Sequence, residues 1–186
     1  MKATLTAVAL TLLFAAPALA KEVQGVKYPD TATVEGKELK LNGVGVRTKF
    51  VFKVYTAGLY VENPSEDGAQ IINADAIKRV RMYMLRDLDK KTISEAMAEG
   101  FKKNAGSKMA ELQPKLDTFT SALTDVKKGD EIILTYVPGQ GTRVQSAKGG
   151  QQITVEGKDF SDALFSIFVG KSPVDDGMKK GMLGKD

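Results

Sequence analysis

The stretch LNGVGVRTKFVFKVYTAGLYVENPS, residues 41–65, carries the pattern that decides the fold. Up to position 54 its even positions are mostly apolar, whereas its odd positions include Arg47 and Tyr55. This period of two predicts a strand, or two strands with a bend, whose even face lies in the core. After Gly58 the apolar residues occupy odd positions, a change of phase that we interpret as a β-bulge. The apolar even positions are Val44, Val46, Phe50, Phe52 and Val54.

Outward from this stretch, the chain alternates between strand-like and helix-like patterns. Strands are predicted within 31–62 and over 77–85, 131–137, 142–147 and 152–157, the last three forming a meander with glycine-rich turns at 138–141 and 148–151. Helices are predicted over 69–74, 93–101, 109–123 with a kink or restart at Pro114, 159–169 ending at Gly170, and 172–183. This order predicts an α+β fold in which helices gather on one face of an antiparallel sheet.

The composition excludes several kinds of chemistry. The 186 residues include no His, Cys or Trp, so a Ser-His-Asp triad, a thiolate nucleophile, a disulfide and a His- or Cys-ligated metal are excluded. We expect no cofactor and no metal. The net charge is only +4 and the lysine pairs are scattered, which argues against nucleic acid as a partner. Gly43-x-Gly45 lacks the third glycine of a dinucleotide-binding motif and precedes a strand.

Residues 1–20 have the pattern of a secretory signal peptide. Lys2 supplies the positive start, an apolar run follows, and Ala18 to Ala20 supply the small residues that a signal peptidase needs. We expect cleavage after Ala20, a domain over 21–186 and delivery to a bacterial periplasm. No later stretch is long and apolar enough to be predicted as a transmembrane helix.

Three separated blocks resemble the chalcone isomerase-like family in the order that the family has them. They are the G-x-G-x-R start followed by KVYTAGLYV in residues 41–65, MLRDLDKKTISEAMAEGF at 84–101, and ALFSIFVGKSPVDDGMKKGML at 163–183. The resemblance implies an open-faced β-sandwich, a long antiparallel sheet with a helical layer on one face. The α+β pattern of the residues agrees with that fold.

The resemblance also implies which residues face a ligand. Arg47 matches the arginine that the family's enzymes use in substrate activation and its fatty-acid binders use to hold the carboxylate. Tyr55 matches the tyrosine of the fatty-acid binders, where the enzymes have threonine. The enzymes' helix tyrosine and asparagine read Ile93 and Gly100 here, so classical chalcone isomerase activity is doubted. The expected ligand-binding residues are Arg47, Tyr55, Tyr60, Ile93, Met97 and Met178, the last of which replaces a polar hydroxyl.

Three hypotheses about function remain open from the sequence. An apolar cleft with one arginine suits a fatty acid or a similar amphiphile, because the tail is buried and the cation binds the head group. Alternatively, Arg47 stabilises an enolate in an isomerase or intramolecular lyase that acts on an enone. The third hypothesis is an envelope module that binds a protein partner. No catalytic residue is assigned except Arg47 under the second hypothesis.

Overall fold

A seven-stranded antiparallel sheet organises the computed structural model, which describes residues 20–147 and 152–185. Its strands follow chain order, so each strand pairs with the next one along the sequence. They are β3 (Thr31–Val34), β4 (Lys37–Lys49), β5 (Phe52–Val61), β6 (Lys78–Met84), β7 (Glu131–Val137), β8 (Gly141–Ser146) and β9 (Ile153–Val155). A separate hairpin of β1 (Ala20–Val23) and β2 (Val26–Pro29) precedes them. The expected turn at 148–151 lies outside the described residues.

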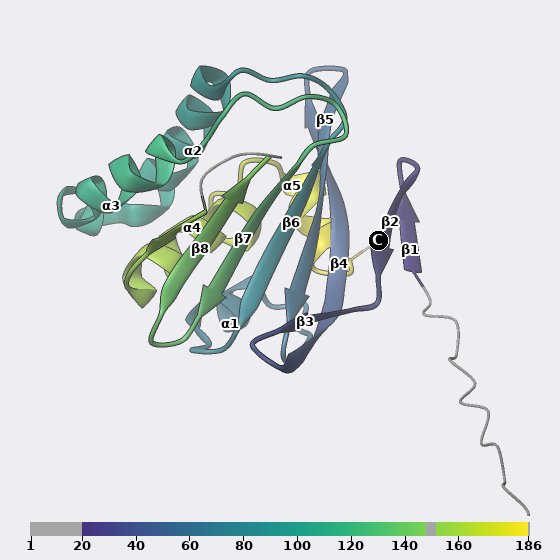
Figure 1. Cartoon of the computed structure of the whole chain (residues 1–186). Coiled ribbons are helices and arrows are strands. Elements are labelled where there is room, and N and C mark those ends of the chain that lie inside the picture. The colour runs from purple at the N-terminus through teal and green to yellow at the C-terminus, as the bar shows by residue number, and fades with distance from the viewer. Residues whose placement is uncertain (1–19, 148–151, 186) are drawn as a thin grey trace, which may run out of the picture.

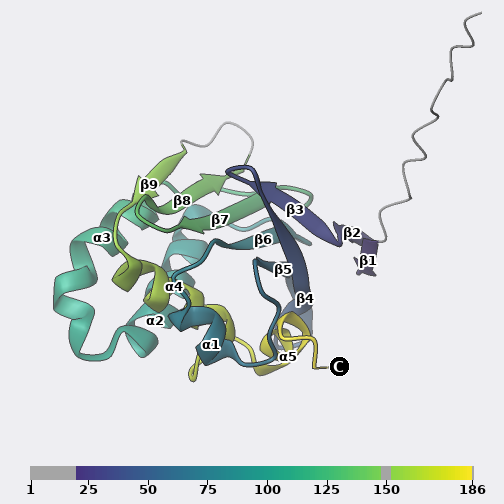
Figure 2. The same cartoon turned by 90° about the horizontal axis from the view of Figure 1, so that it is seen from below.

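The helices pack against one face of this sheet, as both views of the fold show (Figures 1 and 2). They are α1 (Gly68–Asn73), α2 (Lys90–Ala105), α3 (Met109–Ser121), α4 (Lys158–Val169) and α5 (Asp176–Met182), with the short 3₁₀ turn η1 (Gly106–Lys108) between α2 and α3. The prediction of an α+β fold with a helical layer on one face of an antiparallel sheet is therefore confirmed. No helix in the described part of the chain is long and apolar enough to cross a membrane.

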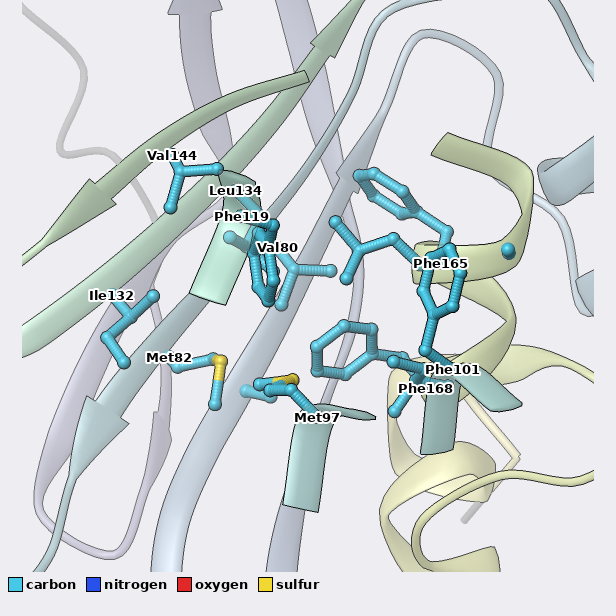
Figure 3. Close-up of a cluster of buried hydrophobic side chains, with 14 of the residues drawn as sticks. Val80, Met82, Met97, Phe101, Phe119, Ile132, Leu134, Val144, Phe165 and Phe168 are labelled. Carbon is cyan, nitrogen blue, oxygen red and sulfur yellow. The ribbon is translucent and has the colours of Figure 1, made fainter. Parts of the chain in front are cut away.

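The main hydrophobic core lies between the sheet and the helices (Figure 3). Alternate residues of β6, among them Val80 and Met82, point into it from the sheet. The apolar stripe predicted for the first long helix does the same, since Met97 and Phe101 are both buried. The Phe101 ring lies 5.3 Å from the ring of Phe160 on α4, centroid to centroid, so α2 and α4 pack directly against each other.

A smaller hydrophobic cluster covers part of the sheet's other face. Tyr28 of β2 is fully buried there, and its hydroxyl lies 2.6 Å from that of Thr56 on β5. The Arg81 guanidinium lies 5.0 Å from the Tyr28 ring centroid. Burial raises the pKa of the Tyr28 phenol to about 12. The sequence patterns did not predict the β1–β2 hairpin that carries this tyrosine.

The change of phase at Gly58 is not a bulge, and this overturns one predicted site residue. Strand β5 pairs with β6 without a shift from Tyr55 to Val61. Because side chains alternate along a continuous strand, Tyr55 faces the helices whereas Tyr60 lies in the cluster on the other face. The shifts in register fall instead between Leu41 and Gly43 and between Arg47 and Thr48.

The prediction of a buried even face is wrong at the end of the β4–β5 hairpin. Phe50 is 88% exposed and Phe52 is 53% exposed, because they lie at the turn that ends the hairpin. Val44 is buried, but in the cluster opposite the helices. The predicted kink or restart at Pro114 does not interrupt α3, which continues through that residue. The break at Gly106, whose φ is +57°, lies between the two long helices that the sequence predicts separately.

Helix α5 lies so close to β4 that the contact requires glycine. A Cβ atom added at Gly43 would lie 2.2 Å from the carbonyl oxygen of Gly181, and one at Gly45 would lie 2.1 Å from that of Met178. From the helix side, a Cβ at Gly181 would lie 2.5 Å from the carbonyl oxygen of Val44. The two glycines of the G-x-G are therefore required for the packing of α5 against β4. This role agrees with the rejection of the G-x-G as a dinucleotide-binding motif.

We expect Gly45→Ala to lower the free energy of unfolding by about 3 kcal/mol, because the added methyl group meets helix backbone that cannot rotate away. Gly177→Ala is the matched control on the same helix: Gly177 is exposed, and its Cβ would meet only one side-chain oxygen, at 3.2 Å. That variant should stay within about 1 kcal/mol of the parent protein. Urea denaturation measures both, and equal stability of the two variants would contradict the proposed contact.

Candidate functional site

A cavity of about 500 Å³ opens between the helix-facing side of the sheet and α2. Strands β4, β5 and β6 form one wall, α2 forms the opposite wall, and the segment before α5 closes one side. The lining residues are Arg47, Lys49, Phe50, Phe52, Val54, Tyr55, Met82, Met84, Arg86, Leu88, Thr92, Ile93, Glu95, Ala96, Met97, Glu99, Gly100, Lys103, Ile167, Ser172, Pro173 and Val174. Its volume is in the range of small-molecule sites, about 300–1,000 Å³.

Apolar side chains line the deeper part of this cavity. Met82 and Met84 contribute from β6, and Ile93 and Met97 contribute from the facing side of α2. All four side chains are at least 95% buried. Methionine is unbranched and flexible, so a wall rich in methionine can adapt to an apolar ligand of irregular shape.

Arg47 of β4 supplies a cation to the cavity lining and pairs directly with Tyr55 of β5. Its Nη1 donates to the carbonyl oxygen of Thr48 at 2.7 Å and to Oδ2 of Asp175 at 3.3 Å. The side chains of Arg47 and Asp175 are 20% and 15% exposed, so the pair is only partly shielded from solvent. Within the described residues neither Nε nor Nη2 of Arg47 makes a hydrogen bond, which leaves two donor groups for a ligand.

Asp175 joins Arg47 to the start of α5. Its Oδ1 accepts a hydrogen bond from the backbone N–H of Met178 at 2.8 Å, so Asp175 is the N-cap of the helix. Its Oδ2 accepts from the backbone N–H of Thr48 at 3.0 Å as well as from Arg47. One carboxylate therefore caps α5, links the helix to β4 and positions the guanidinium.

Tyr55 places a phenol beside the arginine. The residue is 8% exposed, and burial raises the pKa of its hydroxyl far above the usual value, although nearby Arg47 opposes that shift. The phenol is therefore neutral at ordinary pH and can donate a hydrogen bond. No hydrogen bond joins its hydroxyl to another residue in the part of the chain that the structure describes, so this donor is available to a ligand.

Charged side chains surround the mouth of the cavity, and most are cationic. Lys49, Arg86 and Lys103 line it together with Glu95 and Glu99. Lys103 donates to Glu99 at 2.7 Å, and this hydrogen bond lowers the pKa of that carboxyl. The excess of positive charge at the mouth favours an anionic ligand.

The structure brings four of the six predicted site residues together. Arg47, Tyr55, Ile93 and Met97 all line the cavity, although a ligand-binding role for them stays a prediction. Tyr60 lies on the opposite face of the sheet because β5 has no bulge at Gly58.

Met178 is fully buried in the main core and is absent from the lining, because its backbone packs directly on Gly45. Its predicted place in the cleft is therefore wrong. The sequence patterns did not predict Met82 and Met84 as lining residues, although their alternation in residues 78–84 was visible. They did not predict Asp175 as the partner of Arg47 either, although an aspartate just before a helix is typical of an N-cap.

Polar groups that could hold a metal do not gather in the described part of the chain: no group of three or more Asp or Glu side chains has the required arrangement there. Arg47 and Tyr55 supply hydrogen-bond donors to the cavity and the apolar walls lie beside them, an arrangement that can bind or stabilise an anion.

Comparison with known proteins adds family and fold. A family model described as chalcone isomerase-like matches residues 20–184. No curated protein matches the chain significantly. Among solved structures, a fatty-acid-binding protein of Arabidopsis thaliana is similar, with a TM-score of 0.67 and 19% sequence identity; the match covers 89% of this chain and 95% of that one. At this identity the likeness shows the fold.

Because Asp175 caps α5, we expect Asp175→Ala to lower the free energy of unfolding by about 1–2 kcal/mol. Asp175→Asn keeps the capping oxygen and loses the ion pair with Arg47, so its loss should be smaller. Thermal and urea unfolding of both variants provide the comparison. An alanine variant as stable as the parent would refute the role of Asp175 in holding the helix.

Proposed function

The chain belongs to the chalcone isomerase-like family, and on that premise we propose that it is a non-catalytic binder of a fatty acid or a similar apolar carboxylate, held in the cavity between sheet and helices. The observation that carries this proposal is the division of the cavity: hydrogen-bond donors lie at Arg47 and Tyr55, and apolar walls lie beside them. The name of the similar Arabidopsis structure, a fatty-acid-binding protein, supports the same ligand class.

The carboxylate head is proposed to bind Arg47 and Tyr55. A guanidinium can donate two parallel hydrogen bonds to a carboxylate from two nitrogens on the same edge. Within the residues that the structure describes, the hydrogen bonds of Arg47 use only Nη1, so the edge formed by Nε and Nη2 is open to a ligand. The neutral phenol of Tyr55 adds a third donor from the neighbouring strand. Charge-assisted hydrogen bonds of this kind contribute about 1.5–3 kcal/mol each when they are well formed.

The tail is proposed to lie against the methionine-rich wall. Burial of a methylene group contributes about 0.8 kcal/mol, so a long tail supplies most of the binding free energy without any directional contact. Met82, Met84 and Met97 provide such a surface, and Ile93 continues it along α2.

Catalytic cyclisation of a polyphenol is less well supported by these walls. A buried phenolic hydroxyl without a partner costs about 1–3 kcal/mol, and the α2 wall offers Ile93 and Gly100 where the family's enzymes have polar side chains. A Cβ at Gly100 would already lie 2.9 Å from Ile167, so α4 occupies the space an amide side chain would need. Turnover of a chalcone above the rate of Arg47→Ala would overturn the proposal of a non-catalytic binder.

The head-group site predicts that Arg47→Ala weakens binding of a long-chain acid by about 10- to 100-fold, the equivalent of one or two charge-assisted hydrogen bonds. Binding of the methyl ester of the same acid should change by less than about threefold, because the ester has no charge for the guanidinium to bind. Isothermal titration calorimetry of both ligands measures the effect. Equal losses for acid and ester would refute the anchoring role.

Arg143→Ala is the matched control for that variant. Arg143 also forms an ion pair, with Glu35, and its side chain is 26% exposed against 20% for Arg47, but it does not line the cavity. Its removal should leave binding of both ligands unchanged. Met97→Gln provides the complementary arm: it makes the wall polar and should weaken acid and ester alike, by about tenfold.

We further propose that the protein acts in a bacterial periplasm after removal of residues 1–20. The signal-like pattern of the sequence supports this; apart from Ala20, which begins β1, the segment lies outside the described residues. Expression of the full chain in a Gram-negative host, followed by mass spectrometry of the periplasmic fraction, should give a mature protein that begins at Lys21. Retention of residues 1–20 on protein in the cytoplasm would contradict the proposal.

A further inference from the structure

The turn between β4 and β5 exposes three consecutive large apolar residues. Phe50, Val51 and Phe52 are 88%, 83% and 53% exposed, and within residues 20–147 and 152–185 they are the large hydrophobic side chains left in solvent. The turn stands at one end of β4 and β5, two of the three strands that form one wall of the cavity (Figure 1). Exposed apolar groups concentrated at one projecting point are typical of an interaction site.

The backbone at this turn is strained by the residue that it carries. Phe50 has a φ of +56°, in the left-handed region that favours glycine, and it occupies the first position of a two-residue hairpin turn. Glycine or asparagine would fit this position with less strain and would leave less apolar surface in water. The fold does not use the Phe50 side chain in its core, so folding does not account for a phenylalanine here.

Cationic side chains surround the apolar tip on both sides. Lys49 and Lys53 flank it directly in the sequence; Lys49 lines the cavity, whereas Lys53 donates to Gln24 of the β1–β2 hairpin at 2.8 Å. Arg86 lies over the Phe52 ring, 4.6 Å from its centroid. The tip thus has apolar side chains at its end and cationic side chains behind them. A bilayer surface has the complementary order, because its acyl chains lie beneath its anionic head groups.

We propose that the β4–β5 hairpin tip docks the protein on an anionic lipid bilayer, with Phe50 and Val51 inserted among the acyl chains and Lys49, Lys53 and Arg86 on the head groups. Phe50 and Phe52 also line the cavity, so docking sets the cavity mouth against the lipid surface. The inference goes beyond the proposed function and does not depend on what the cavity holds, because it rests on the exposure of the apolar side chains at the tip and on the cations beside them.

Phe50→Gly gives the sharpest test, since glycine suits the left-handed φ and removes the exposed ring. In cosedimentation with vesicles of phosphatidylcholine and phosphatidylglycerol, this variant should bind at least about tenfold more weakly than the parent protein. Its stability to urea should be equal to or greater than that of the parent, which separates loss of binding from loss of fold. Equal vesicle binding by variant and parent would overturn the proposal.

Charge is tested with a matched pair of double variants. Lys49→Gln with Lys53→Gln should remove the preference for vesicles that contain phosphatidylglycerol over those of phosphatidylcholine alone. Lys37→Gln with Lys40→Gln, two exposed lysines toward the other end of β4, should bind as the parent does. The same loss in both double variants would show attraction by net charge alone and overturn docking through the tip.

Insertion is read directly from a single introduced tryptophan, excited at a wavelength that tyrosine does not absorb. The chain has no tryptophan, so Phe50→Trp reports from the tip alone. Its emission should shift to shorter wavelength with anionic vesicles and should be quenched by brominated acyl chains. A parent protein that ignores both kinds of vesicle, or one that forms a dimer which Phe50→Gly dissolves, would overturn the proposal; the dimer would assign the tip to a second copy of the chain. Binding of a long-chain acid by the parent protein, measured in parallel without vesicles, tests the cavity separately. A loss of vesicle binding in Phe50→Gly therefore bears on docking whether or not the parent protein binds the acid.

Discussion

The contact between β4 and α5 is the constraint on which the site depends. Two glycines of the strand and one of the helix allow backbone to approach backbone at distances that any Cβ would prevent. This close approach fixes where α5 begins relative to β4, and therefore where Asp175 lies at the N-terminus of the helix. Because Asp175 holds the guanidinium of Arg47, a packing requirement at Gly43, Gly45 and Gly181 determines where the cation of the cavity lies.

The sheet register completes that arrangement. Asn42 is the extra residue of the first shift in β4, and its side chain binds the backbone of Ser65 and the carbonyl oxygen of Met182. The shift turns Gly43, Gly45 and Arg47 toward the helices, so the strand presents two hydrogen atoms to α5 and one long cationic side chain to the cavity. The register shift in β4 thus places Asn42, in the N-terminal half of the chain, in contact with the last helix.

Much of this fold could be predicted from the sequence, because its evidence is periodic. The apolar run of β7 between its turns and the four-residue spacing of Ile93, Met97 and Phe101 arise from contacts with one core, and both predicted elements are present. The face of Tyr60 could not be obtained in this way, because a register shift changes the meaning of odd and even positions without changing the composition. The pairing of Arg47 with Asp175 was equally hidden, since the two residues are 128 positions apart and their meeting depends on the packing of α5.

The ion pair at Arg47 also bears on how quickly a ligand could leave. Of the Arg47 nitrogens only Nη1 donates a hydrogen bond to Asp175, so a carboxylate that binds the Nε–Nη2 edge adds to this ion pair and does not have to displace it. The head group would therefore leave by breaking only its own hydrogen bonds, and each buried methylene group of the tail would slow its release further.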